Sequence, residues 1–237
     1  MTFQSNTLNL QLCNICCITV VVFKLTKIVI MPPKFKVSKE EIISAALFIT
    51  RRAGIGCVTA REIGAELGLS SRPIFSWFES MQQVRDAVYD AAKQIYTEYL
   101  QRGLSQPIPF LGLGQQFIRF AQKEGELYRL LFLTKPKDSH GGAIAAMKYT
   151  QELARPSLML IYKIDAHTAD CYFRDLWLVA FSFGTLIVTN GCFYTNKEIS
   201  AIMTEFSLSI CKAYKEIPGL PDGKIDIDAQ FKAIIGR

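Results

Sequence analysis

Three evenly spaced helix starts between residues 31 and 100 constrain the fold of this chain more than any other feature. Each is a capping box, a Ser or Thr followed three residues later by a Glu or Gln. The hydroxyl accepts a hydrogen bond from a free backbone N–H, and the acid or amide reaches back to the cap. The three boxes are Ser38 with Glu41, Thr59 with Glu62, and Ser80 with Gln83. The sequence therefore predicts a series of successive helices here.

Apolar side chains recur on one face of each predicted helix. The first helix carries Ile42, Ala46, Ile49 and Ala53 and stops at Gly54–Gly56; the second covers about Ala60–Leu67, with Ile63 and Leu67 inward, and stops at Gly68; the long helix after Ser80 carries Val84, Val88, Ala91, Ile95 and Tyr99. Stripes of this period face a core, and glycine favours the positive φ of helix ends. The segment is therefore expected to form an all-helical domain.

A further short helix, Ser71–Phe78, is predicted just before the long one. Ser70 is its expected N-cap, and Pro73 falls in the first turn, where proline is tolerated. Two short helices joined by a tight turn that contains glycine form a helix-turn-helix, whose second helix lies in the major groove of DNA. The apolar residues expected to anchor this helix are Ile74, Phe75 and Phe78.

The remaining residues of this segment are candidates for DNA contact. The set predicted to face DNA is Ser70, Ser71, Arg72, Pro73, Ser76 and Trp77. Arg72 is the only long charged donor among them and can pair with guanine or with a phosphate. The free N–H groups at Thr59 and Ala60 suit a phosphate at a helix N-terminus. A basic arm for the DNA backbone or minor groove is predicted from Lys34, Lys36 and Lys39.

These residues resemble the Tet-repressor (TetR) family. Thr59–Ser70 resembles that family's second helix and turn, Ser71–Phe78 its recognition helix, and Ser80–Val84 the start of its fourth helix. Phe75-Ser-Trp-Phe78 stands where the family often has Tyr-x-His-Phe, and Met81 stands where a phosphate-binding lysine often follows; the Trp77 indole can still donate one hydrogen bond. The resemblance implies an all-helical C-terminal domain, a homodimer on palindromic double-stranded operator DNA, and an unknown small apolar inducer that releases a repressor.

The rest of the chain is also predicted to be helical, which gives an all-α fold. Residues 31–84 are assigned to the DNA-binding domain, 85–219 to a ligand-binding and dimerisation domain, and 220–237 to a tail, with a break at residues 101–109. The predicted helices are Phe110–Phe132, Ala143–Glu152, Ser157–Ile164, Ala166–Asn190 capped by Asp165, and a last helix opened by Thr195 and Glu198; Pro136–Gly142 is a predicted loop.

The last two helices, about 166–190 and 196–217, are rich in apolar residues, and the first of them must be buried nearly all round. They resemble the pair that forms the family's dimer interface; an intramolecular core is the alternative. A ligand pocket is expected among the middle helices, where apolar walls and a few polar groups converge. Its candidate residues are Phe117, Tyr128, Phe132, Tyr149, Tyr162, Trp177 and Phe181, with plain core packing as the alternative for each.

Composition is that of a cytoplasmic protein without a metal or cofactor. The net charge of +6 is compatible with nucleic-acid binding. The seven cysteines are irregularly spaced, which disfavours a disulfide framework, and Cys13, Cys16 and Cys17 lack the second pair of ligands that zinc needs. No glycine-rich phosphate loop and no Gly-x-Ser-x-Gly motif occurs. The chain is therefore not expected to be an enzyme.

Two other classes of protein remain as alternatives. The apolar run Ile15–Phe23 is too short to span a bilayer, and lysines follow it rather than precede it. Met31 begins a normal-looking basic start, so residues 1–30 are interpreted as an upstream extension and no membrane is expected. A membrane-associated interaction protein anchored by residues 1–30 is one alternative. An enzyme that uses His167 and Cys171, which share a helix face, is the other.

Overall fold

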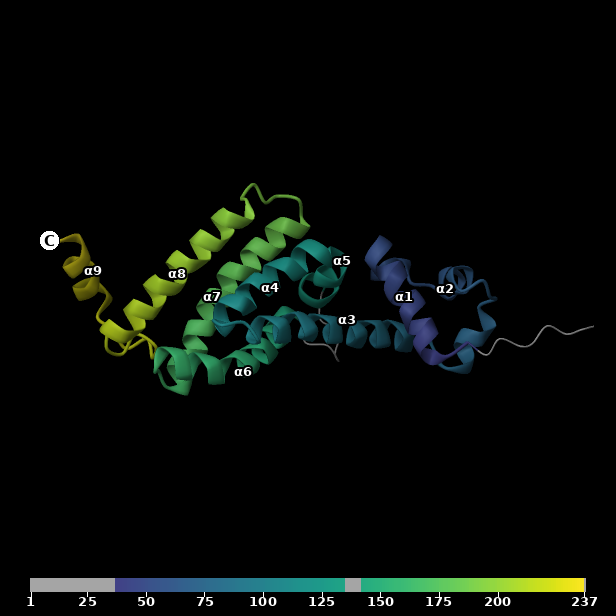
Figure 1. Ribbon diagram of the computed structural model, residues 1–237, viewed down its shortest axis with the longest axis horizontal. Helices are drawn as coiled ribbons and strands as arrows, with labels where there is room; N and C mark the ends of the chain where they lie inside the picture. Colours follow the sequence, from purple (N-terminus) through teal and green to yellow (C-terminus); the bar gives the residue numbers. More distant parts are fainter. Residues whose placement is uncertain (1–36, 135–141, 237) are drawn as a thin grey trace, which may run out of the picture. The chain divides into compact units, whose positions relative to one another are not determined.

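The computed structural model describes residues 37–134 and 142–236, and every regular element within these ranges is a helix (Figure 1). The predicted all-α fold class is confirmed. Residues 36–237 form one compact unit, within which the domain boundary at residue 84 stays a prediction. The extension at residues 1–30, the basic residues Lys34 and Lys36, and all but the last residue of the loop Pro136–Gly142 lie outside the described residues.

The first group of helices follows the predicted caps. It consists of α1 (Lys39–Ala53), the 3-10 helix η1 (Ile55–Cys57), α2 (Ala60–Glu66), the 3-10 helix η2 (Arg72–Ser76) and α3 (Met81–Leu104). Ser38, Thr59 and Ser80 each accept a hydrogen bond from the backbone N–H three residues on. The reciprocal bond forms only at Ser38 among these three; at Ser80 the Gln83 side chain accepts from the Glu79 N–H instead. All three helix starts are therefore confirmed.

The second group begins after a short turn. It consists of α4 (Pro109–Lys123), α5 (Gly125–Tyr128), the π-helical turn η3 (Arg129–Leu133), α6 (Gly142–Tyr162), α7 (Ala166–Val188), α8 (Asn196–Glu216) and α9 (Ile227–Ile235). Asp165 caps α7, and Thr195 with Glu198 forms a full capping box on α8, both as predicted. α7 and α8 pack against each other as two long helices (Figure 1).

The buried stripe of α3 runs along the whole helix. Its members are Val84, Val88, Ala92, Tyr96 and Leu100. The later residues predicted for this face, Ala91, Ile95 and Tyr99, lie beside the stripe and are half-buried, and Ala53 of α1 is exposed. In the second half of α3, the buried residues lie one position after the predicted ones. The reason is that α3 packs on three different elements along its length, namely α1, α4 and η3.

The prediction of one helix across Phe110–Phe132 is wrong at Glu124. The chain leaves the helical conformation there, with φ −125° and ψ 45°, between α4 and α5. The Glu124 carboxylate accepts two hydrogen bonds from the Arg51 guanidinium of α1, each 2.8 Å long. This contact joins residues far apart in the sequence, so no local pattern announces the break.

The predicted break between Ala143–Glu152 and Ser157–Ile164 is also wrong, because α6 continues across Pro156. A proline in a helix interior costs about 3 kcal/mol. The buried residues Thr150, Ala154 and Leu158 lie four residues apart on one face. Burial of this continuous face against α7 and α4 outweighs the lost hydrogen bond.

α3 and α4 cross at two buried glycines, Gly103 and Gly112. A Cβ added at Gly112 would lie 2.2 Å from the Gly103 carbonyl oxygen, and one added at Gly103 would lie 2.7 Å from the Gly112 oxygen. Side-chain atoms cannot approach a backbone so closely, so this crossing requires glycine on both helices. Gly103 lies inside the segment predicted as a break between domains, where the structure instead has the end of a tightly packed helix.

We expect Gly112→Ala to destabilise the protein by about 2 kcal/mol, because the added methyl group forces α3 and α4 apart. This cost exceeds the ~1 kcal/mol by which alanine favours a helix over glycine. Gly125→Ala is the matched control, since a Cβ there would meet nothing closer than 3.9 Å. Denaturant unfolding measures both variants, and equal stabilities would contradict the close crossing.

Candidate nucleic-acid interface

α2 and η2 are joined by a tight turn over a buried apolar contact. Gly68 has a φ of +67°, and the Leu69 N–H donates back to the Gly64 carbonyl at 2.8 Å. Ile63 of α2 and Ile74 of η2 are fully buried in the same core. The order of short helix, glycine-containing turn and short helix is the predicted one; its use as a helix-turn-helix remains a prediction.

η2 is shorter and tighter than the predicted helix Ser71–Phe78. It is a 3-10 helix that covers only Arg72–Ser76, with Pro73 in its first turn. The N-cap position is Ser71, and its side chain makes no capping hydrogen bond, so the predicted cap at Ser70 is wrong. The 3-10 form suits so short a piece, because each bond spans only three residues.

The residues predicted to face DNA are not equally exposed. Ser70, Arg72, Ser76 and Trp77 are exposed, whereas Ser71 and Pro73 are half-buried. Ile74 and Phe78 anchor η2 as predicted, but Phe75 is 50% exposed, so its predicted anchoring role is wrong. Arg72 makes no ion pair within the part of the chain that the structure describes. Its guanidinium therefore has no acidic partner among the described residues.

Trp77 has a structural role that the sequence did not predict. Its indole N–H donates to the Val37 carbonyl at 2.8 Å, which ties the end of η2 to the residues before α1. In the first turn of α1, the Lys39 ammonium lies 5.4 Å from the centre of the Phe78 ring. The indole N–H is thus already used within the protein, and only the half-exposed ring remains for a partner.

Arg61 is a candidate that the sequence analysis missed. It is exposed in the first turn of α2 and makes no ion pair within the described residues. Its position in the sequence could have indicated it, because Arg61 directly follows Thr59 and Ala60, the predicted phosphate-binding positions. Thr59 is exposed, with its hydroxyl accepting from the Glu62 N–H at 3.2 Å, and Ala60 is half-buried.

A partly shielded ion pair joins α1 to the break between α4 and α5. The Glu124 side chain is only 14% exposed, and its bidentate hydrogen bond raises the pKa of the Arg51 guanidinium. α5 follows directly and contacts both α1 and α7. The Arg129 guanidinium of η3 donates to the Val188 carbonyl at the end of α7. Residues 124–129 therefore connect α1 with α7.

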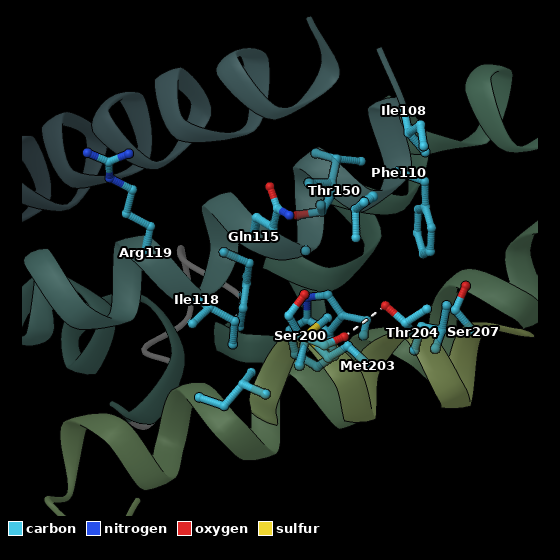
Figure 2. Close-up of a pocket in the computed structure, with 18 of the residues that line it drawn as sticks. Ile108, Phe110, Gln115, Ile118, Arg119, Thr150, Ser200, Met203, Thr204 and Ser207 are labelled. Carbon is cyan, nitrogen blue, oxygen red and sulfur yellow. Dashed lines mark hydrogen bonds between the residues drawn. The ribbon is translucent and has the colours of Figure 1, made fainter. Parts of the chain in front are cut away.

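A cavity of about 720 Å³ lies between α4, α7 and α8, with contributions from α3 and α6. We call it the α8 cavity. Figure 2 shows Ile118 from α4 on one side and Ser200, Met203 and Thr204 from α8 on the other. Of the predicted ligand-binding residues, Phe117, Tyr162 and Trp177 line this cavity, and Tyr128, Phe132, Tyr149 and Phe181 do not.

The four residues outside the cavity have other partners. The Tyr128 hydroxyl donates to the Phe181 carbonyl at 3.1 Å, and burial raises the pKa of Tyr128 to about 12. The Tyr149 hydroxyl lies 3.0 Å from the Thr97 hydroxyl. Phe132 packs on Tyr128, with ring centres 4.7 Å apart. These contacts are those of core packing, the alternative that the sequence left open.

His167 and Cys171 do not have the geometry of a catalytic relay. The Cys171 sulfur lies 3.9 Å from His167 Nε2, and an Asp222 oxygen lies 3.1 Å from the same nitrogen. In a relay the acid binds the other ring nitrogen. Burial raises the pKa of the Cys171 thiol, which disfavours the reactive thiolate. Within residues 37–134 and 142–236, no three His, Cys, Asp or Glu side chains are grouped to hold a metal.

α7 and α8 leave large apolar side chains exposed. Leu178 and Leu186 of α7 are exposed, so the prediction that this helix is buried nearly all round is wrong for the single chain. Phe206 of α8 is exposed too, and Phe193 between the helices is 95% exposed. Among the described helices, only α7 is long and apolar enough to cross a membrane, and half of its apolar window is buried within the protein.

No protein-family model matches this chain, and no curated protein is significantly similar to it.

We expect Trp77→Phe to lower the free energy of unfolding by about 1 kcal/mol, because the Val37 carbonyl loses its donor. Phe75→Leu is the control, since the exposed Phe75 ring contributes little and its loss should change stability by less than about 0.5 kcal/mol. Hydrogen exchange of the amides at the start of α1 should rise only in Trp77→Phe. Unchanged stability and exchange in that variant would show that the indole bond does not hold η2.

Proposed function

We propose that this protein is a ligand-responsive transcriptional regulator of the Tet-repressor kind, which binds palindromic operator DNA as a homodimer and acts as a repressor. The observation that carries the proposal is the two-sided character of η2. Ile74 and Phe78 are buried beneath it, while Arg72 and Ser76 are exposed. A recognition element needs this combination of rigid support on one side and open hydrogen-bond donors on the other.

DNA reading would fall mainly to Arg72. Its guanidinium can make a bidentate contact with a guanine edge or bind a phosphate. Ser76 adds a hydroxyl on the same short helix, and Arg61 adds a second exposed cation on α2 that has no ion pair among the described residues. The net charge of +6 supports attraction to the phosphate backbone.

The proposed dimer forms through α7 and α8. Leu178, Leu186 and Phe206 are exposed on these helices, and a second copy would remove them from water. Pairing would place two copies of η2 in successive major grooves, roughly 34–36 Å apart.

The proposed inducer binds in the C-terminal helices and favours a dimer in which this spacing no longer fits. Such control requires that the inducer bind the two states unequally. α4 supports the idea, because it lines the α8 cavity and ends at Glu124, the partner of Arg51 on α1. We propose a cytoplasmic protein that needs neither a membrane nor a cofactor for this function.

We expect Arg72→Ala to weaken binding to the operator by at least about tenfold and to reduce its salt dependence by about one ion. Lys148→Ala is the matched control, since it removes the same charge from an exposed position on α6. Fluorescence anisotropy with DNA from upstream of the protein's own gene, at two salt concentrations, measures both. Equal affinities of the two variants would contradict the role of η2.

We expect Leu178→Glu to convert the dimer into a monomer, because the carboxylate would be buried without a partner. Ile144→Glu, which changes an exposed apolar residue of α6, should leave the dimer intact. Sedimentation velocity distinguishes the two species. A dimeric Leu178→Glu protein would place the interface elsewhere.

A further inference from the structure

Side-chain hydrogen bonds hold α8 on both sides of the α8 cavity, and near the end of the helix the Tyr214 hydroxyl also donates to Asp175 of α7. Near its start, the Gln122 amide donates to Asn196 at 2.6 Å, and further along, the Ser207 hydroxyl lies 2.6 Å from the Tyr172 hydroxyl. The residues of α8 that line the cavity between these points are Ile199, Ser200, Met203 and Thr204. Ile199 is the only buried residue of α8. The middle of this helix therefore covers the cavity and approaches α4 through Met203, whose methyl group would lie 2.9 Å from a Cβ added at Gly114.

The lining of the α8 cavity offers no partner for a cation and only two exposed residues for an anion. None of its residues is acidic, so a cation would be unpaired. Its two basic residues, Arg119 and Lys123, are both exposed, and the Arg119 guanidinium points away from Ser200 and Met203 (Figure 2). The rest of the lining is mostly apolar, with a few hydroxyl and amide groups. This lining suits an uncharged, mostly apolar molecule, and the volume is that of a small-molecule site.

One buried donor in the wall lacks an acceptor. Trp177 is 5% exposed, and its indole N–H has no hydrogen-bond partner among the described residues. The Tyr96 hydroxyl is bonded to Thr150 at 2.9 Å. The Trp177 N–H faces this hydroxyl closely enough to lower its pKa slightly against the rise from burial, but not within hydrogen-bond geometry. A buried N–H without an acceptor costs about 1–3 kcal/mol. A ligand oxygen that accepts from Trp177 would recover this free energy.

We propose that the α8 cavity binds an uncharged, mostly apolar molecule whose carbonyl or ether oxygen accepts the Trp177 N–H, and that occupancy changes the stability of the dimer. The second part follows because α8 is both the outer wall of the cavity and part of the proposed dimer interface. Only this second part rests on the proposed function. A ligand that fills the space beneath Ser200 and Met203 alters the position of α8, and with it the face that the partner copy meets.

Binding is tested with the full chain and four named probes. The neutral dye Nile red reports occupancy, and 2-nonanone, nonanoate and nonyltrimethylammonium compete for it. These competitors share an apolar chain of similar length and differ in charge. We expect 2-nonanone to compete at least about tenfold better than either ion, since an unpaired charge is costly in an apolar cavity. Absence of dye binding, or equal competition by nonanoate, would overturn the proposal.

Two variants test the donor. Trp177→Phe should weaken 2-nonanone about fivefold, the loss expected for one hydrogen bond. The chain has two tryptophans, so Trp77→Phe leaves Trp177 as the only one. The affinity of the Trp77→Phe protein for 2-nonanone should match that of the wild type, and 2-nonanone should quench the fluorescence of Trp177. Unchanged affinity in Trp177→Phe, or no quenching in Trp77→Phe, would overturn the role of the indole.

The dimer is measured by sedimentation equilibrium of the full chain, with and without saturating 2-nonanone. We expect the dimer dissociation constant to change at least about fivefold, which corresponds to ~1 kcal/mol of coupling. An unchanged constant would overturn the link between cavity and dimer. A chain that is monomeric in both conditions but still binds 2-nonanone would instead overturn the homodimer of the proposed function and leave the ligand site standing.

Discussion

Where α3 and α4 cross, the Gly103 carbonyl and the backbone of Gly112 touch with no room for a side chain between them. The two helices cannot slide along each other without losing this backbone contact, because protein interiors are close-packed. The end of α3 is therefore held firmly on α4. The start of the same helix packs on α1, next to the elements proposed to bind DNA. One continuous helix thus relates the α2–η2 segment to the helices around the α8 cavity.

α4 links three parts of the molecule. It packs on α3, it forms one wall of the α8 cavity, and its last turn leads to Glu124, which holds Arg51 of α1. A change in the position of α4 would therefore alter both the shape of the cavity and the contact with α1. Because the Glu124 carboxylate is mostly buried, this ion pair is less screened by water and salt than a surface pair. These contacts give the proposed control by a ligand a physical route.

The sequence predicted the parts of this fold that depend on neighbouring residues. Five of the six predicted cap residues accept the expected hydrogen bonds, because a cap is a contact within four residues; the exception is Ser70. The prediction from sequence was wrong where contacts between residues far apart in the chain determine the local structure. The break at Glu124 depends on Arg51, and the continuity of α6 through Pro156 depends on its buried face. In the candidate site, Arg72 and Ser76 are exposed as predicted, but the positions of two aromatic residues differ from the prediction. Trp77 is held by Val37 and Phe75 is exposed, because a 3-10 helix turns its side chains differently from the predicted α-helix.

Selection of DNA sequences from a random pool by the full-length protein tests the central claim most directly. Repeated rounds of binding and amplification need no knowledge of the operator. If η2 reads DNA from a symmetric dimer, the recovered sequences should converge on an inverted repeat whose half-sites are about one helical turn apart. The wild-type protein should retain such a site in competition with excess random DNA. A pool that stays random after repeated rounds would contradict the proposal that this protein is a DNA-binding regulator.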